Sequence, residues 1–148
     1  MTPRARPQPR SAYQAFRSLG TRWMDNDQYG HVNNVVYYSF FDTAVNAWLI
    51  EAGALDLERS EVIGLVVETG CSFFEPLTFP QVVEAGLRVA HVGRSSVRYE
   101  IGLFAAGAGL CAAAGHFVHV YVDRRSRRPA PLPSELLRAL QPLASTHG

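Results

Sequence analysis

The sequence contains no lysine, because all 14 of its basic residues are arginine. With 13 acidic residues the formal net charge is only +1, which excludes a general electrostatic attraction to nucleic acid or to a membrane surface. Arginine suits anionic groups through its forked donors, but we interpret the missing lysine first as a compositional bias of the genome. We therefore expect no nucleic-acid partner and no membrane partner.

Cysteine is scarce as well, with only Cys71 and Cys111, both in apolar, strand-like sequence. One pair is too few for a disulfide scaffold, and we expect buried free thiols. Four histidines share no metal-ligand spacing with a neighbouring acid or cysteine: His91, His116, His119 and His147. We therefore predict no metal ion and no cofactor.

The start of the chain lacks the apolar core of a secretory signal. Residues 1–10 contain three arginines and three prolines, and proline opposes the amphipathic helix of an organellar transit peptide. We expect residues 1–12 to form a disordered tail of a cytoplasmic protein. Residues 13–148 are expected to form a single domain.

One long apolar run extends from Val35 to Ala52 and stops at Gly53, a residue that favours helix C-termini. Asp42 and Asn46 interrupt it, which argues against a membrane span. The run is hydrophobic nearly all round, which predicts a central, enclosed helix. Its few polar residues fall at helical spacing and predict a thin stripe facing solvent or a subunit interface. They are Ser39, Asp42, Thr43 and Asn46.

The hydrophobic period changes after this helix. From Val97 to Leu103 apolar residues alternate with polar ones, as in a half-buried strand. We predict a strand within residues 13–24, four more over 62–74, 81–92, 95–104 and 110–122, and a short helix from Ser134, as its cap, to Leu140. This order predicts an α+β fold with an antiparallel sheet packed on one helix. Uncovered sheet edges favour an edge-to-edge dimer.

Residues 25–34, Asp-Asn-Asp-Gln-Tyr-Gly-His-Val-Asn-Asn, form a dense polar group directly before the long helix. Asparagine favours the N-cap position, so we expect Asn33 or Asn34 to cap the helix. The free N–H groups and the dipole of a helix start suit a developing oxyanion. A turn through Gly30 brings Asp27 near the same spot. A carboxylate there can attack a carbonyl or activate water, and an electrophilic thioester is its natural substrate.

The pattern Asp27-x-x-Gly30-His31-Val32-Asn33-Asn34-x-x-Tyr37 resembles the signature of the hot-dog-fold acyl-CoA thioesterases, the group that includes 4-hydroxybenzoyl-CoA thioesterase. The similarity extends to the long helix, to the turn over residues 92–97 and to the proline-rich segment 128–133. It covers about residues 15–141. The resemblance implies a five-stranded antiparallel sheet wrapped around one central helix, and a dimer or tetramer with two sites at each subunit interface.

The same resemblance assigns roles to individual residues. Asp27 matches the catalytic aspartate, a nucleophile or general base, and Asn34 the helix start whose backbone N–H polarises the thioester carbonyl. Three further residues match the oxyanion and substrate site: Gly30, His31 and Tyr37. The turn with Arg94 and Ser95 matches the region where relatives bind the phosphates of coenzyme A, a role that suits arginine.

Several structural alternatives stay open. Asp25 and Asn33 are interpreted as turn and cap residues, while His31 could simply bond backbone. Tyr37 could fill the core rather than line the acyl pocket, and Arg94 could be an exposed turn residue. The arginine-rich segment 124–128 could be a nucleic-acid patch, although the low net charge favours a solvated turn or an added phosphate contact.

The sequence departs from the 4-hydroxybenzoyl-CoA enzyme at residues 31–34. That enzyme has an apolar and aromatic segment there, whereas this chain has His-Val-Asn-Asn and looks more like fatty acyl thioesterases of the fold. An aromatic substrate is not implied, and the choice between coenzyme A and acyl carrier protein stays open. Two rival functions use the same fold: a non-catalytic acyl-thioester binding or sensing module, and a hydratase or dehydratase, whose differently placed histidine and acid pair we do not find.

Overall fold

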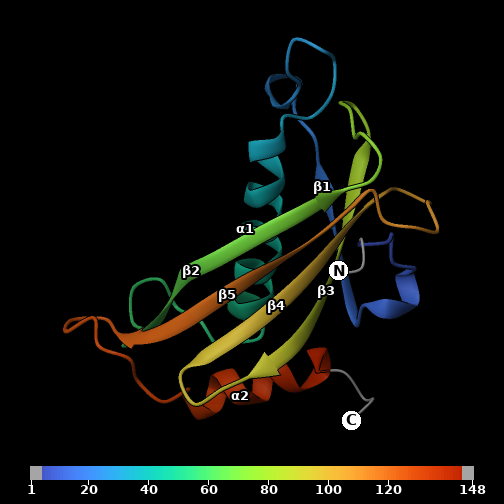
Figure 1. Ribbon diagram of the computed structural model, residues 1–148. Coiled ribbons are helices and arrows are strands. Elements are labelled where there is room, and N and C mark those ends of the chain that lie inside the picture. The colour runs from blue at the N-terminus through green and yellow to red at the C-terminus, as the bar shows by residue number, and fades with distance from the viewer. Residues whose placement is uncertain (1–4, 145–148) are drawn as a thin grey trace.

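The structure is a computed structural model that describes residues 5–144. It contains one antiparallel sheet with the strand order β1-β3-β4-β5-β2 (Figure 1). The strands are β1 (Ala15–Gly20), β2 (Val62–Phe73), β3 (Val82–Val92), β4 (Ser96–Ala105) and β5 (Ala113–Asp123). The predicted α+β fold is confirmed, and the four later strands begin and end within three residues of the expected limits.

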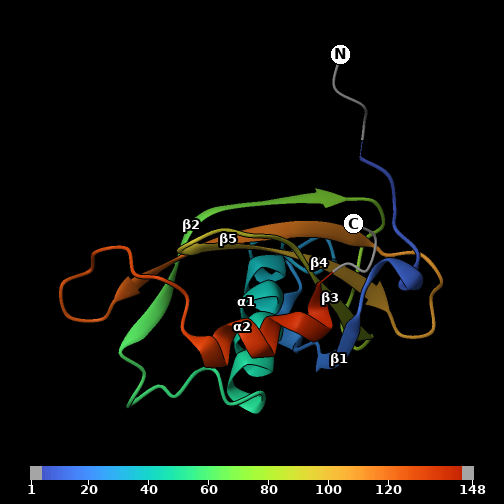
Figure 2. The same cartoon turned by 90° about the horizontal axis from the view of Figure 1, so that it is seen from below.

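The long helix α1 (Asn34–Glu51) crosses one face of this sheet. The short helix α2 (Ser134–Leu140) lies on the same side, as Figure 2 shows. The rings of Phe41 on α1 and Phe117 on β5 meet edge to face with centroids 5.9 Å apart. Trp48 joins the two helices, because its indole N–H donates to the carbonyl of Ala139 at 2.9 Å. The core therefore lies between the sheet and the two helices.

The predicted central helix is confirmed, because α1 packs on the sheet with its apolar side. Only one side of the helix is buried, and Ser39, Asp42 and Thr43 are exposed on the other. The amide of Asn46 donates to Oδ1 of Asp42 at 2.9 Å. The predicted polar stripe therefore exists and faces solvent, because the sheet has no second layer to cover that side of the helix.

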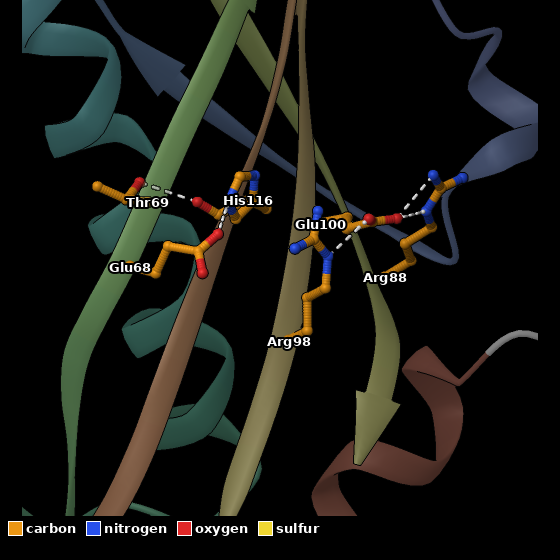
Figure 3. Close-up of polar contacts among 6 residues, drawn as sticks. All are labelled: Glu68, Thr69, Arg88, Arg98, Glu100 and His116. Atoms are coloured by element: carbon orange, nitrogen blue, oxygen red, sulfur yellow. Dashed lines mark hydrogen bonds and ion pairs between the residues drawn. The ribbon is translucent and has the colours of Figure 1, made fainter. Parts of the chain in front are cut away.

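The opposite face of the sheet carries a row of charged residues (Figure 3). Glu100 on β4 accepts from Nε of Arg88 at 2.9 Å and from Nε of Arg98 at 3.1 Å. Burial raises the pKa of Glu100, but these two bonds outweigh it, so the pKa lies below its usual value. Nε2 of His116 lies 2.8 Å from Oε1 of Glu68 on β2. These pairs lie away from α1 and stabilise the sheet across four strands.

The structure places residues 8–12, assigned above to a tail, against the sheet. The backbone N–H of Gln8 donates to Sγ of Cys111 at 3.2 Å, and Arg10 pairs with Glu84 at 2.7 Å. Cys111 is buried and Cys71 half-buried, and both are free thiols. Residues 1–4 and His147 lie outside the described residues.

Other sequence expectations differ in detail. The N-cap of α2 is Pro133, and Ser134 is the first helical residue without a capping bond, so the predicted cap is wrong. In the arginine-rich turn, Arg124 donates to three backbone carbonyls of the loop after α1, those of Leu57, Glu58 and Ser60. Arg124 is therefore a brace for that loop. Between residues 5 and 144, no helix is long and apolar enough to cross a lipid bilayer.

Candidate active site

The segment before α1 forms a closed turn. The N–H of Asp27 donates to the carbonyl of His31 at 2.8 Å, and the N–H of Gly30 donates back to the carbonyl of Asp27 at 3.0 Å. Gly30 has a φ of 80°, in the left-handed region that side chains other than glycine rarely adopt. The predicted bend at Gly30 is therefore confirmed, and it sets the position of Asp27.

The carboxylate of Asp27 is held through one of its two oxygens. Oδ1 accepts the backbone N–H of Tyr29 at 2.8 Å and, more weakly, that of His31 at 3.4 Å. Among the described residues, Oδ2 has no hydrogen-bond partner. The turn therefore orients the carboxylate while one oxygen stays available to a ligand.

Two neighbours of Asp27 hold the segment that contains the turn, Asp25 through local bonds to Arg22 and Asn26 through bonds to a distant part of the chain. Asp25 is only 2% exposed, and its carboxylate accepts the backbone N–H of Arg22 at 2.7 Å and Nη2 of the same residue at 2.9 Å. Oδ1 of Asn26 accepts the N–H of Phe79 at 3.0 Å, and Oγ1 of Thr78 donates to the carbonyl of Gly30 at 2.6 Å. The structural interpretation of Asp25 is confirmed. The bonds of Asn26 were not predicted, because its partners lie 52 and 53 residues further along the chain.

The start of α1 resolves the choice between the two asparagines. Asn33 is the N-cap, because its Oδ1 accepts the N–H of Val35 at 3.2 Å. The N–H of Val36 donates to the carbonyl of Asn33 at 2.9 Å. The backbone N–H of Asn34 has no partner within the described part of the chain. Asn34 is therefore the first helical residue, and its N–H is open at the positive end of the helix dipole.

These groups meet in an open pocket of about 390 Å³. Four of the predicted site residues line it: Asp27, His31, Asn34 and Tyr37. Gly30, the other residue predicted there, lies in the turn and is not among the residues that line the pocket. The opposite wall is formed by Phe73, Phe74, Glu75 and Pro76 at the end of β2, which sequence analysis treated only as a strand end and a turn. The pairing of β2 with β5 brings this wall to the site, and no local sequence signal reports that pairing.

Tyr37 lines the pocket and also belongs to the core, so the core interpretation is confirmed and a contact with an acyl group stays a prediction. Its side chain is 2% exposed, its ring packs on Phe73 with centroids 4.9 Å apart, and its hydroxyl accepts the N–H of Leu77 at 3.3 Å. Burial raises the pKa of Tyr37, which keeps the hydroxyl protonated. Tyr37 therefore connects the helix to the segment that follows the pocket wall.

Arg94 and Ser95 lie far from this pocket within one chain. Phe73 in the pocket wall pairs with Ala113 on β5, whereas the turn with Arg94 leads into β4 opposite Val120. Seven residues of strand separate these two levels, which corresponds to about 23 Å. Backbone atoms of both residues are used in the fold, since the carbonyl of Ser95 accepts from the N–H of Tyr121 at 2.7 Å. A single chain does not bring the expected coenzyme A residues to Asp27.

Comparison with known proteins identifies the family. A model of the thioesterase-like superfamily matches residues 21–140, so this chain belongs to the thioesterase-like superfamily and is a thioester hydrolase by class. The crystal structure of the PA5185 protein from Pseudomonas aeruginosa strain PAO1 is 55% identical with a TM-score of 0.93, and the match covers 97% of this chain and 100% of that one. No curated protein matches the sequence significantly.

More distant structures share the fold. Slr0204, a 1,4-dihydroxy-2-naphthoyl-CoA thioesterase from Synechocystis, is 19% identical with a TM-score of 0.77, over 84% of this chain and 93% of that one. The BH1999 gentisyl-coenzyme A thioesterase is 24% identical with a TM-score of 0.74, over 85% of this chain and 99% of that one. The predicted hot-dog thioesterase family and fold are thereby confirmed.

Proposed function

We propose that this chain hydrolyses acyl-CoA thioesters in the pocket lined by Asp27, with Asp27 as the catalytic carboxylate. One observation supports this most strongly. The turn holds Oδ1 of Asp27 and leaves Oδ2 without a partner among the described residues, in the same pocket as the open N–H of Asn34. A carboxylate oxygen and an oxyanion donor are the two groups that addition to a thioester carbonyl requires.

Both chemical routes fit this arrangement. In the first, Oδ2 attacks the carbonyl carbon, the carbon–sulfur bond breaks with release of the thiolate, and water hydrolyses the resulting mixed anhydride. In the second, Oδ2 takes a proton from a water molecule as the water adds to the carbonyl, and the tetrahedral intermediate then expels the thiolate. In either route the N–H of Asn34 stabilises the negative charge on the carbonyl oxygen.

Glu75 is the other carboxylate in the pocket and the direct competitor for the catalytic role. It is exposed, and its backbone N–H bonds to the carbonyl of Ala112 at 3.1 Å. Thiol release from a panel of acyl-CoAs by Asp27→Asn and Glu75→Gln separates the two. We expect loss of turnover in Asp27→Asn and near-normal turnover in Glu75→Gln. The opposite pattern would identify Glu75 as the catalytic carboxylate. If the unaltered chain binds acyl-CoA without releasing thiol, the sensing module would be supported instead.

The acyl group is a separate part of the proposal. The two CoA thioesterases named above act on hydroxylated aromatic acyl groups, but at their identities they support only the shared fold. We propose coenzyme A as the carrier and leave the acyl class to the panel, which should contain aromatic, short, medium and long straight-chain thioesters. The His-Val-Asn-Asn segment at residues 31–34 resembles that of the fatty acyl thioesterases of the fold, so an aromatic substrate is not implied.

We also propose an edge-to-edge dimer. β2 is an edge strand, and three consecutive apolar residues on it, Leu65, Val66 and Val67, are 37%, 45% and 61% exposed. Such an edge is a template for pairing with another strand. Light scattering should give twice the 16.3 kDa of one chain, and Val67→Lys should shift the mass toward the monomer. A monomeric mass for the unaltered chain would contradict this part. The cytoplasmic location stays a prediction.

A further inference from the structure

The N-terminal segment, residues 8–13, lies on the face of the sheet that points away from α1. The ring of Tyr13 covers Gly102 on β4, because a Cβ at Gly102 would come within 2.5 Å of two of its ring carbons. Gly102 is two residues from Glu100, so both belong to the same face of the sheet. Tyr13 is only 6% exposed. The end of the segment is therefore packed on the sheet.

Two further contacts attach the N-terminal segment to β3 and to the connection between β4 and β5. Arg10 pairs with Glu84 at 2.7 Å, and its Nε donates to the carbonyl of Ala108 at 2.6 Å. The N–H of Gln8 donates to Sγ of Cys111 at 3.2 Å, and its carbonyl accepts the N–H of Cys111 at 3.0 Å. The segment and this connection lie side by side in both cartoon views (Figures 1 and 2). The segment therefore holds the backbone of Cys111.

The next residue, Ala112, holds the wall of the Asp27 pocket. Its carbonyl accepts the N–H of Phe74 at 2.8 Å and that of Glu75 at 3.1 Å. Both N–H groups lie just beyond the end of the ladder between β2 and β5. They depend on a single carbonyl, which belongs to the residue after Cys111. The N-terminal segment and the pocket wall are therefore connected through two adjacent residues.

Side chains make the same connection. Tyr13, Phe104 and Cys111 form a small buried cluster, and Phe74 packs against it. The rings of Tyr13 and Phe104 meet edge to face with centroids 5.9 Å apart. Phe74 is half-buried and also lines the Asp27 pocket. A displacement of Tyr13 is therefore transmitted to the pocket by packing as well as by hydrogen bonds.

The groups that we assign to the chemistry are held by other contacts. The turn at residues 27–31 orients the carboxylate of Asp27, and the capped start of α1 places the open N–H of Asn34. None of these bonds involves residues 8–13 or the connection between β4 and β5. Release of the N-terminal segment should therefore move Phe74 and leave both reactive groups in place. Such a change affects substrate binding more than the chemical step.

We propose that the N-terminal segment is a positioning element of the Asp27 pocket. Through Cys111 and Ala112 it fixes Phe74, and the position of Phe74 sets how tightly an acyl-CoA binds. Phe74 contacts the substrate, whereas Tyr13 and the rest of the segment act only through it. The effect on acyl-CoA rests on the proposed function, but the connection between the segment and the pocket wall does not.

A pair of glycine variants tests this connection. Gly102→Ala displaces the ring of Tyr13 without changing the segment itself. Gly109 lies in the connection between β4 and β5 and has open space around its Cβ position, so Gly109→Ala is the matched control. Hydrogen exchange followed by NMR measures the opening of individual backbone N–H groups. We expect exchange at Phe74 and Glu75 to become at least about tenfold faster in Gly102→Ala and to stay unchanged in Gly109→Ala.

The N–H of Asp27, which bonds to the carbonyl of His31, distinguishes positioning from a general loss of stability. Its exchange rate should stay the same in both variants. An unchanged rate at Phe74 in Gly102→Ala, or an equal rise at Phe74 and Asp27, would overturn the proposal. If Gly102→Ala fails to fold, Arg10→Ala, at a partly exposed residue, removes a second attachment of the segment and should give the same pattern.

Binding of a non-hydrolysable thioether analogue of an acyl-CoA measures the effect on the pocket. We expect Gly102→Ala to raise the Kd of the analogue and the KM for thiol release about tenfold, with kcat within about twofold of the unaltered chain. Gly109→Ala should match the unaltered chain. Equal Kd values for the two variants would overturn the proposal. An unaltered chain that binds the analogue but releases no thiol would contradict only the proposed hydrolysis, and the ratio of the two Kd values would still decide this proposal.

Discussion

Oδ1 of Asp27 accepts the backbone N–H of Tyr29 at 2.8 Å. This bond ties the carboxylate to its own turn, so its direction depends on the backbone conformation at residues 27–31. Hydrogen bonds of Asp25 and Asn26 attach this turn to the fold on one side. The capped start of α1 attaches it on the other. The reactivity proposed for Asp27 therefore depends on residues that do not touch substrate.

Gly30 tests the backbone part of this dependence. Its φ of 80° costs a residue with a side chain about 1 kcal/mol, although the space around its Cβ position is open. We expect Gly30→Ala to lower the free energy of unfolding by about that amount and to reduce kcat by misplacing Asp27. Gly20→Ala is the control, since Gly20 also has open space but an ordinary φ. Urea unfolding and thiol release measure both effects, and equal kcat values for the two variants would contradict the role of the turn.

Asp25 tests the support beneath the turn. Its buried carboxylate receives three hydrogen bonds from Arg22, and hydrogen bonds of a charged group contribute about 2 kcal/mol. Asp25→Asn should therefore lower the free energy of unfolding by about 2 kcal/mol, measured with urea. Glu58→Gln, at an exposed carboxylate, should change it by less than about 0.5 kcal/mol. Similar changes in the free energy of unfolding for the two variants would contradict the structural role of Asp25.

Arg94 tests the coenzyme A part of the proposal. If its guanidinium binds phosphate in the assembled enzyme, Arg94→Ala should raise KM for an acyl-CoA about tenfold and leave kcat almost unchanged. KM for the matching N-acetylcysteamine thioester, which has no phosphate, should not change. A parallel rise with both substrates would show that Arg94 acts on the fold instead. The distance of Arg94 from Asp27 within one chain means that this effect also requires a second copy.

His119 predicts a pH dependence of stability. Burial lowers its pKa to about 4 in the folded chain, against about 6.5 when unfolded, so between these values the unfolded chain binds the additional proton. Stability is then complete above pH 6.5 and falls as the pH falls toward 4. Between pH 7 and pH 5 the loss should be about 2 kcal/mol. Urea unfolding of the unaltered chain and of His119→Phe isolates this contribution, and identical pH profiles would contradict it.

The sequence predicted those parts of the molecule that local chemistry determines. Alternation from Val97 to Leu103 identified β4, and the preference of asparagine for N-caps limited the start of α1 to two residues. The pocket wall at Phe73 and Glu75 and the brace between Asn26 and Phe79 were not predictable in this way. They depend on strand pairing and on contacts about 50 residues apart, for which single-sequence periodicity contains no signal.

Two other differences have the same origin. The central position of α1 and its polar stripe were predicted correctly, but the sequence did not indicate which residues of the sheet would cover its apolar side. The sequence around His119 contains no signal of the Tyr99 ring on the adjacent strand or of the pocket that His119 lines. The local sequence pattern thus identified the segment that lines the candidate pocket, whereas the other residues of the pocket depend on tertiary packing.

The turnover of Asp27→Asn is the most direct test of the proposed chemistry. The amide keeps the size of the side chain and an oxygen for the N–H of Tyr29, but it can neither attack a thioester nor take a proton from water. Single-turnover thiol release should slow at least about 100-fold, while the unfolding midpoint and the affinity for a non-hydrolysable thioether analogue of an acyl-CoA stay the same. A rate within threefold of the unaltered chain, with the same analogue affinity, would contradict the assignment of Asp27 as the catalytic carboxylate.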